Sequence, residues 1–542
     1  MRHNFLWIVM LLLAVSCLDD KNNYNYKDIN TVGDSKITGL RSVYTCFPGE
    51  EVRLVPEVKL SKDTLNPDVS YSWYVNGALI ENTDSIYTFT SDVIATHKIV
   101  FCVTDNQTGV QFVAGTQVSV ESRWLKGWMI LSKGAGDASQ VSMVLMRRSE
   151  VALPENQTKD TIYYDGQDIN IVKDLGTGPK GLRESFMIYD YAFDGAMDEV
   201  VVLQDNKCAE LHGSDLHKVI NTEEEFSGAV PSNFRPLDAI MTTGLKCVLD
   251  QDGYVYTSTG AVITDFHAGR YPSEPAFNKR KFKALYQSNR NNAKFFLALD
   301  ANNTLVGIVD DATAAGYGSQ DVQMGGKAGA LAEIRFPESS YDKTLFQNIP
   351  EEVLFTTWTD GEYEDPSFVS LLKGQSDYYM HTYSFEYKSN PSSEEPNLDV
   401  ISTNGRTHKI SSAMMNNFTD AVALYYYKCL IVANGNKLYS CSLTDENDPG
   451  KEFKTFGGNI VAIDAKDMGR DPDSPRYDFG GAHVGVALDN GEFYIYELKY
   501  DKDAARVTEM RELYHYAGFG NIVDVIYKYG ESSMITFPYQ PN

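Results

Sequence analysis

The residues that could carry chemistry are scattered along the chain instead of forming a known catalytic motif. The 542 residues contain no glycine-rich phosphate loop, no HExxH zinc motif and no GxSxG nucleophile turn. Among the nine histidines, His212 and His217 stand five residues apart near a turn. They could bind a metal ion, but no third ligand is evident, so solvated loop histidines are the preferred interpretation. The sequence thus predicts no catalytic residue, metal site or cofactor.

Carboxylates are abundant, and two polar loops are dense in them. The loops are residues 360–365 and the segment that holds Asp471, Asp473 and Asp478. Neither follows the spaced ligand pattern of a calcium-binding EF-hand, which favours solvated acidic loops over calcium sites. The whole chain has a formal net charge of −26. Such a surface repels phosphate backbones, so nucleic acid is not expected as a partner.

Aromatic side chains in loop-like segments are the candidates for ligand binding. Rings exposed on a domain surface can stack on sugar faces or peptide side chains. Packing inside the fold is the alternative, and it is preferred for any single one of them. The candidates are Tyr163, Tyr164, Tyr271, Trp358 and Tyr363.

The N-terminus has the features of an export signal. Arg2 precedes the apolar run 5–15, which is too short to span a bilayer and fits the core of a signal peptide. The run ends in small residues before Cys17, which resembles the bacterial lipobox, where the cysteine is lipidated. Residues 1–16 are therefore expected to be a lipoprotein signal peptide. An ordinary signal peptide with an incidental cysteine is the alternative.

Residues 17–35 are polar and cannot bury enough apolar surface to fold, which predicts a flexible acidic tether. Asp19 and Asp20 after the cysteine resemble the surface-export signal of Bacteroidota lipoproteins, and a plain solvated linker is the alternative. We expect the protein at the outer membrane, facing the cell exterior. No later segment is long and apolar enough for a membrane helix, so the lipid is the only membrane contact implied.

The composition predicts an all-β chain, because aromatic and β-branched residues are plentiful and long stretches of helical period are missing. Residues 36–122 resemble an immunoglobulin-like or PKD-like β-sandwich, with expected strands at 51–58, 69–75, 86–90 and 98–104. The words YSWYVNG, which starts at Tyr71, and VTD, which starts at Val103, carry the PKD resemblance. The resemblance also implies a candidate disulfide between Cys46 and Cys102, with buried free thiols as the default.

From residue 123 to residue 542, apolar runs meet turns of Asp, Asn and Gly at intervals of about 40–75 residues. The turn anchors are positions 137, 205, 250, 300, 360, 434, 489 and 530. Hairpins at such spacing indicate a β-propeller of seven blades if the first and last hairpins share a blade, with eight as the alternative. A three-residue loop at Asn434–Asn436 would place Cys429 opposite Cys441, a second candidate disulfide.

The order of these signals resembles the PKD-like family lipoproteins of Bacteroidota. The order comprises the signal peptide, Cys17 with its acidic tether, the sandwich, and the word GWMILS, which starts at Gly127 and opens the next domain. Membership would imply a non-enzymatic accessory role beside a SusC/SusD-type transporter that imports peptides or oligosaccharides. A propeller glycoside hydrolase or lyase acting on the same polymer is the alternative, since a sequence cannot show the carboxylate spacing that hydrolysis needs.

Overall fold

The computed structural model divides the chain into two compact units, with the boundary after Ser122. No helix in the described part of the chain has the length and apolar character needed to cross a membrane. The structure describes residues 30–31, 35–62, 67–152, 158–190, 195–205, 207–241, 245–259, 270–286, 295–309, 329–360, 366–388, 395–424, 427–466, 482–501, 503 and 505–528.

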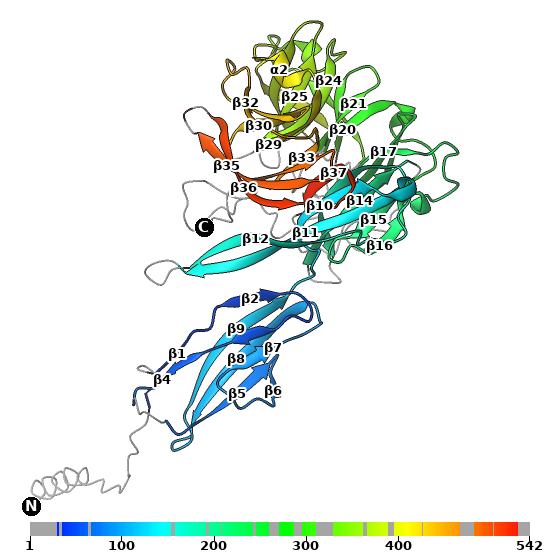
Figure 1. Cartoon of the computed structure of the whole chain (residues 1–542). Coiled ribbons are helices and arrows are strands. Elements are labelled where there is room, and N and C mark those ends of the chain that lie inside the picture. Colours follow the sequence, from blue (N-terminus) through cyan, green and yellow to red (C-terminus); the bar gives the residue numbers. More distant parts are fainter. Residues whose placement is uncertain are drawn as a thin grey trace, which may run out of the picture. The chain divides into compact units, whose positions relative to one another are not determined.

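The first unit is a β-sandwich (Figure 1). Its large sheet has the order β2-β9-β8-β5-β6, and β2 pairs in parallel with β9. Trp73 is fully buried at its centre and packs on Phe101 with ring centroids 4.5 Å apart. The strands are β1 (Lys36–Thr38), β2 (Val43–Cys46), β3 (Val52–Leu54), β4 (Glu57–Lys59), β5 (Val69–Val75), β6 (Ala78–Ile80), β7 (Tyr87–Phe89), β8 (Ala95–Asp105) and β9 (Gln111–Val120).

Two expectations for the sandwich need correction. The strand predicted over 51–58 is two strands, β3 and β4, which pair with different partners. Pro56 lies between them and has no N–H for the ladder, which explains the break.

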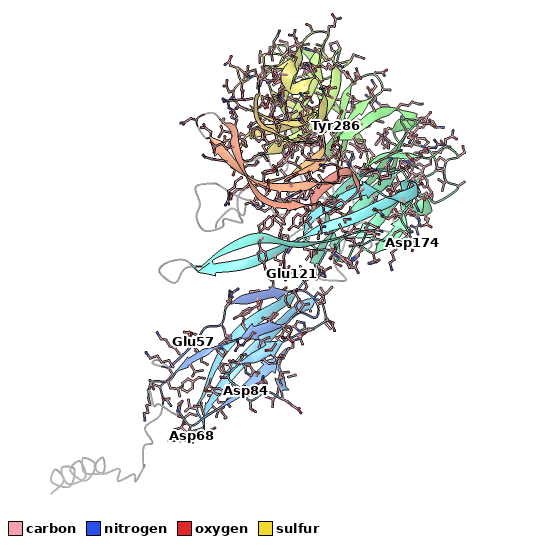
Figure 2. The ribbon with its side chains drawn as sticks, in the orientation of Figure 1. Glu57, Asp68, Asp84, Glu121, Asp174 and Tyr286 are labelled. Atoms are coloured by element: carbon pink, nitrogen blue, oxygen red, sulfur yellow. The ribbon has the colours of Figure 1, made fainter. Side chains whose placement is uncertain are left out.

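The surface of the sandwich carries acidic side chains, as the exposed Glu57, Asp68 and Asp84 illustrate (Figure 2).

The candidate disulfide Cys46–Cys102 does not form, and both cysteines are buried free thiols. Cys46 lies opposite Val120, which in turn lies opposite Ala95 at the start of β8. Cys102 is seven residues further along β8, which corresponds to about 23 Å. A disulfide requires Cα atoms within about 7 Å.

The second unit is a β-propeller, and its described residues form seven blades. Most blades are antiparallel sheets of four strands, and the third has three among the described residues. The blades, each from its inner strand outward, are β37 (Asn521–Lys528), β10 (Gly127–Lys133), β11 (Ser139–Ala152) and β12 (Thr158–Asp168); β13 (Pro179–Asp190), β14 (Gly195–Gln204), β15 (Cys208–His212) and β16 (Lys218–Asn221); β17 (Pro236–Met241), β18 (Leu245–Asp250) and β19 (Val255–Thr259); β20 (Phe282–Tyr286), β21 (Phe295–Asp300), β22 (Leu305–Val309) and β23 (Leu331–Arg335); β24 (Glu352–Asp360), β25 (Ser367–Lys373), β26 (Tyr378–Lys388) and β27 (Asn397–Thr403); β29 (Phe418–Leu424), β30 (Cys429–Asn434), β31 (Lys437–Ser442) and β32 (Lys451–Thr455); and β33 (Ile460–Lys466), β34 (His483–Leu488), β35 (Phe493–Asp501) and β36 (Arg506–Tyr516).

The ring closes through the last strand of the chain. β37 pairs with β10 and completes the first blade, so the red and cyan ends of this unit lie side by side in Figure 1. The inner strands contact one another in the order β37, β13, β17, β20, β24, β29 and β33, and β33 contacts β37 again. The last described strand therefore shares a blade with the first hairpin, which gives seven blades among the described residues. Closure of this kind removes exposed sheet edges at the centre.

Separate clusters of apolar side chains fill the interfaces between blades. In β30, Cys429 and Ile431 face β33–β35 of the next blade, whereas Leu430 and Val432 face β25 and β26 of the previous blade. Because the middle strands are buried on both faces, they need apolar residues at every position. This explains the uninterrupted apolar runs in the sequence.

Tight packing between the last blade and the first depends on a residue without a side chain. Gly485 lies in β34, and a Cβ atom there would stand 2.5 Å from the indole of Trp128. Trp128 is fully buried and also packs on Phe493 and Tyr527. The Gly-Trp word at the start of the propeller therefore provides the core of the closing interface.

Most of the predicted turn anchors occupy one equivalent place, the turn between the second and third strands of a blade. This holds for positions 137, 205, 250, 300, 434 and 489. Anchor 360 instead ends the inner strand β24, and the equivalent turn of that blade lies between β25 and β26, where Gly374 donates to the carbonyl of Asp377 at 2.8 Å. Anchor 530 lies outside the described residues.

The candidate disulfide Cys429–Cys441 is also wrong. Asn434 pairs with Lys437, so the loop has two residues instead of the predicted three. The register then sets Cys441 opposite Leu430, and Cys429 and Cys441 point to opposite faces of the blade. Both remain buried free thiols. Burial raises the pKa of the Cys441 thiol well above its ordinary value, which keeps it protonated and unreactive.

Candidate functional site

Every inner strand of the propeller carries a β-bulge near its start, where the pairing register shifts by one residue. In three blades the residue after the bulge is an aspartate: Asp238, Asp420 and Asp524. In each case the carboxylate accepts a hydrogen bond from the next backbone N–H, at 2.8–2.9 Å. A bulge changes the direction in which a side chain points. Here it turns the carboxylates along the inner ring, which is the circle of the seven inner strands.

Asp420, Asp524 and a further inner-strand residue, Asp464, connect neighbouring blades at the inner ring. Asp420 accepts from the N–H of Ile463 at 2.9 Å, and Asp464 accepts from that of Tyr527 at 2.7 Å. Asp524 accepts from the N–H of Leu182 at 2.7 Å. Each bond runs from one inner strand to the next, so the three form a chain of clasps across four consecutive blades. Hydrogen bonds to charged acceptors are stronger than neutral ones.

One arginine of the inner ring lies between the carboxylates of two other blades. Arg183 on β13 pairs with Asp238 at 2.8 Å and lies 3.8 Å from Asp524. Burial, with Asp524 and Asp464 nearby, raises the pKa of Asp420 to about 7. Burial also raises the pKa of Asp524 to about 6, although Arg183 opposes this shift. The ring therefore holds carboxyl groups that release their protons near neutral pH. Tyr286 ends the inner strand β20 of the fourth blade (Figure 2).

We expect the propeller to lose about 3 kcal/mol of unfolding free energy as the pH rises from about 5.5 to about 8. Both pKa values are raised above their ordinary value, so the folded state binds these protons more tightly than the unfolded state. The resulting stabilisation is complete at low pH and is lost as the pH rises through 6–7. Chemical denaturation at several pH values measures this slope.

The variant Asp420→Asn should flatten this pH dependence. The matched control is Asp489→Asn, an exposed carboxylate that likewise accepts a backbone N–H, from Asn459 at 3.1 Å. A slope that stays the same in Asp420→Asn, or that changes equally in both variants, would show that the inner ring does not set the pH dependence.

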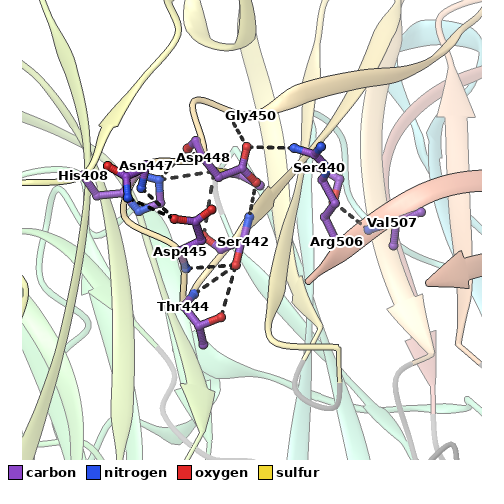
Figure 3. Close-up of polar contacts among 11 residues, drawn as sticks. His408, Ser440, Ser442, Thr444, Asp445, Asn447, Asp448, Gly450, Arg506 and Val507 are labelled. Atoms are coloured by element: carbon purple, nitrogen blue, oxygen red, sulfur yellow. Dashed lines mark hydrogen bonds and ion pairs between the residues drawn. The ribbon is translucent and has the colours of Figure 1, made fainter. Parts of the chain in front are cut away.

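A second polar network joins three blades around Asp448, in the turn between β31 and β32 (Figure 3). Its carboxylate accepts from the N–H of Ser442 at 2.8 Å and from Arg506 on β36 at 3.1 Å. Its carbonyl lies 2.6 Å from Nε2 of the buried His408, which precedes β28 (Lys409–Ile410) beside β26. Only 2% of the Asp448 side chain is exposed, so the network positions the turn and does not present a ligand site.

The five candidate aromatic residues do not form one site. Tyr164 is buried and its hydroxyl lies 3.0 Å from Nδ1 of His483, at the interface of the first and last blades. Tyr271 is fully buried, Trp358 packs against an apolar cluster, and Tyr163 is partly exposed on β12. Tyr363 lies outside the described residues, as do Cys17 and the acidic loops at 361–365 and 471–478.

Tyr271 lies beside a buried ion network that the sequence reasoning missed. Lys246 on β18 contacts Glu210 at 2.8 Å and Glu225 at 2.5 Å, and all three side chains are at most 1% exposed. The ammonium lies 5.9 Å from the centre of the Tyr271 ring, and Thr222 donates to Glu210 at 2.6 Å. Burial raises the pKa of Glu210 to about 7, against the attraction of Lys246. Lys246 thus contacts two buried carboxylates at once.

His212 and His217, interpreted from the sequence as solvated loop residues, converge with Asp215 at the turn between β15 and β16. Among the described residues, these are the His, Cys, Asp and Glu side chains whose ligand atoms are grouped closely enough to hold a metal ion. Asp215 is the third ligand that sequence reasoning did not identify, although it stands between the two histidines.

A repeated word in the sequence marks three of the inner strands. Asp238-Ala239-Ile240, Asp420-Ala421-Val422 and Asp524-Val525-Ile526 share an aspartate followed by two small or branched apolar residues. The first two words precede the turn anchors 250 and 434 by 12 and 14 residues, whereas the anchor of the blade that holds Asp524, position 137, comes earlier in the sequence. The signal was therefore weak without knowledge of the blade order.

Solved structures similar to this chain include several propellers, all at low identity. A quinonprotein alcohol dehydrogenase-like protein of Bacteroides thetaiotaomicron is 13% identical, with 90% of this chain and 96% of that chain covered and a TM-score of 0.32. Hsv2 of Kluyveromyces lactis is 7% identical, with 70% and 96% covered and a TM-score of 0.34. The Cps50 (Swd1) β-propeller domain of Myceliophteria thermophila is 9% identical, with 72% and 96% covered and a TM-score of 0.34.

No curated protein matches the chain in sequence. The sequence model of the PKD-like family matches residues 17–170. The match covers the sandwich and continues past Ser122 through β10, β11 and β12 of the first blade. The N-terminal segment of this chain, residues 17–170, is therefore a PKD-like family segment.

Proposed function

We propose that the chain is a lipid-anchored protein of the outer-membrane surface that acts as a non-enzymatic accessory component of a SusC/SusD-type uptake system for peptides or oligosaccharides. The observation that carries the proposal is Cys17, which follows an apolar run of signal-peptide length and precedes a polar segment. The PKD-like segment that begins at the same cysteine supports it.

Tethering would explain how such a component works without a deep chemical site. The polar segment from Cys17 to about Asp34 would reach on the order of 20–25 Å as a flexible coil. Anchoring to the same membrane makes association with a transporter effectively intramolecular, so even a weak contact becomes useful. The inner-ring carboxylates Asp420 and Asp524 each accept two backbone N–H groups, so they hold neighbouring strands together.

A hydrolase or lyase remains the second candidate, and one observation favours it. Asp420 and Asp524 have raised pKa values of about 7 and about 6. A carboxyl group that is protonated near neutral pH can serve as a general acid. Catalysis would require the two groups to leave their backbone donors and meet a substrate.

Purification of the protein from native membranes tests the proposal. With an affinity tag on this chain and a mild detergent, we expect a SusC-type transporter and its SusD-type partner to co-purify. The Cys17→Ala variant, which lacks the lipid, should recover much less of the pair. Calorimetry with peptides and oligosaccharides imported by that transporter then identifies the ligand class. Absence of the transporter together with absence of ligand binding contradicts the proposal, and cleavage of an added polymer favours the second candidate.

A further inference from the structure

The turn between β15 and β16 brings two imidazole rings and a carboxylate together on blade 2. His212 ends β15 and His217 precedes β16, and the N–H of His212 donates to the carbonyl of His217 at 2.9 Å. The two rings stack with centroids 4.9 Å apart and planes inclined by 22°. Oδ1 of Asp215 lies 2.6 Å from Nδ1 of His217 and 3.3 Å from Nδ1 of His212.

The turn is held in this conformation by its buried residue. Leu216 is 1% exposed and adopts φ +57°, in the left-handed region that branched and bulky side chains rarely occupy. Its N–H donates to the carbonyl of His212 at 2.9 Å. Packing of the Leu216 side chain into the blade therefore fixes the backbone that carries the histidines and Asp215.

The three candidate ligand atoms lie near the separation that a bound metal ion needs, and Oδ1 of Asp215 and Nδ1 of His217, 2.6 Å apart, must move slightly apart to share one ion. All lie within 4.8 Å of one another. An ion at about 2.1 Å from nitrogen and oxygen ligands sets them roughly 3.0–3.4 Å apart. The backbone N–H and the hydroxyl of Ser214 lie 3.4 and 2.9 Å from Nδ1 of His212, so this nitrogen carries a lone pair that a metal ion would take over from Ser214.

We propose that His212, Asp215 and His217 bind one divalent transition-metal ion of the zinc class, with the remaining coordination positions open to solvent. Two imidazoles and one carboxylate suit zinc and its neighbours better than calcium or magnesium, which prefer oxygen ligands. The side chains of His212, Asp215 and His217 are 25%, 47% and 58% exposed, so an ion can enter from solvent. Three protein ligands leave a position for water or for a group of a bound molecule. The site is independent of the function proposed above.

Titration of the full chain with zinc chloride tests the site. The protein carries no polyhistidine tag and is first freed of metal with a chelator. We expect one ion per chain by calorimetry. The variant His217→Ala should weaken binding at least about 100-fold, since even loss of a residue that only orients a ligand costs 10–100-fold. The matched control is His515→Ala, because His515 is 40% exposed and pairs with one carboxylate, Glu492, at 3.5 Å.

Cobalt substitution gives a second readout that does not depend on affinity alone. The visible absorption of bound cobalt should be present in the wild type and in His515→Ala, and absent in His212→Ala. Asp215→Asn retains the size of the side chain but not its charge, and it should weaken binding. Absence of stoichiometric binding, or equal weakening by His515→Ala, would overturn the proposal and leave the turn as a hydrogen-bonded hairpin only.

Discussion

Replacing Lys246 by methionine should lower the free energy of unfolding of the propeller by about 3–5 kcal/mol. The ammonium lies between Glu210 and Glu225 and has no access to solvent. Its removal takes away the ammonium that both buried carboxyl groups contact, and each then becomes costlier to ionise. The cost should shrink at acidic pH, because protonation neutralises both groups. Chemical denaturation followed by tryptophan fluorescence measures the loss.

A surface ion pair provides the matched control for this prediction. Lys437 contacts Glu452 at 2.7 Å, but the two side chains are 40% and 37% exposed. The Lys437→Met variant should therefore cost at most about 1 kcal/mol. Adding Glu210→Gln and Glu225→Gln to Lys246→Met should recover a large part of the stability. Equal losses in the two single variants would contradict the account of the buried network.

The succession of blades could be predicted from the sequence because the middle strands have a recognisable apolar pattern. A strand buried on both faces must be apolar throughout, and a tight turn beside it requires Asp, Asn or Gly. The runs that end at Asp250, Asp300 and Leu488 satisfy both conditions. The turn anchor of the fifth blade could not be located correctly, because the turn from Gly374 to Asp377 lacks an Asp-Gly or Asn-Gly pair.

Contacts between blades could not be predicted, because they join residues that are remote in sequence. Lys246 and Glu210 lie on different blades, and nothing local marks either of them as buried. A register difference of one residue decides whether two cysteines face each other or point apart, as Cys429 and Cys441 show. The sequence suggests a three-residue loop between these strands, whereas the loop has two residues.

Loss of the lipid should have the largest effect on the function proposed here. Substitution of Cys17 by alanine removes the thiol that would be acylated, so the protein should leave the membrane fraction and appear as a soluble species. A single alanine elsewhere in the tether should have no such effect.

The double variant Asp19→Asn/Asp20→Asn serves as the matched control, because it keeps the cysteine but removes the acidic residues that resemble a surface-export signal. We expect it to stay membrane-bound but to be retained inside the cell envelope.

Protease treatment of intact cells tests the central claim most directly. In a Bacteroidota host, wild-type protein should be degraded by external protease while a periplasmic marker stays intact, and mass spectrometry should find acyl chains on Cys17. The Asp19→Asn/Asp20→Asn protein should be protected. A wild-type protein that resists external protease, or that carries no lipid on Cys17, would contradict the account.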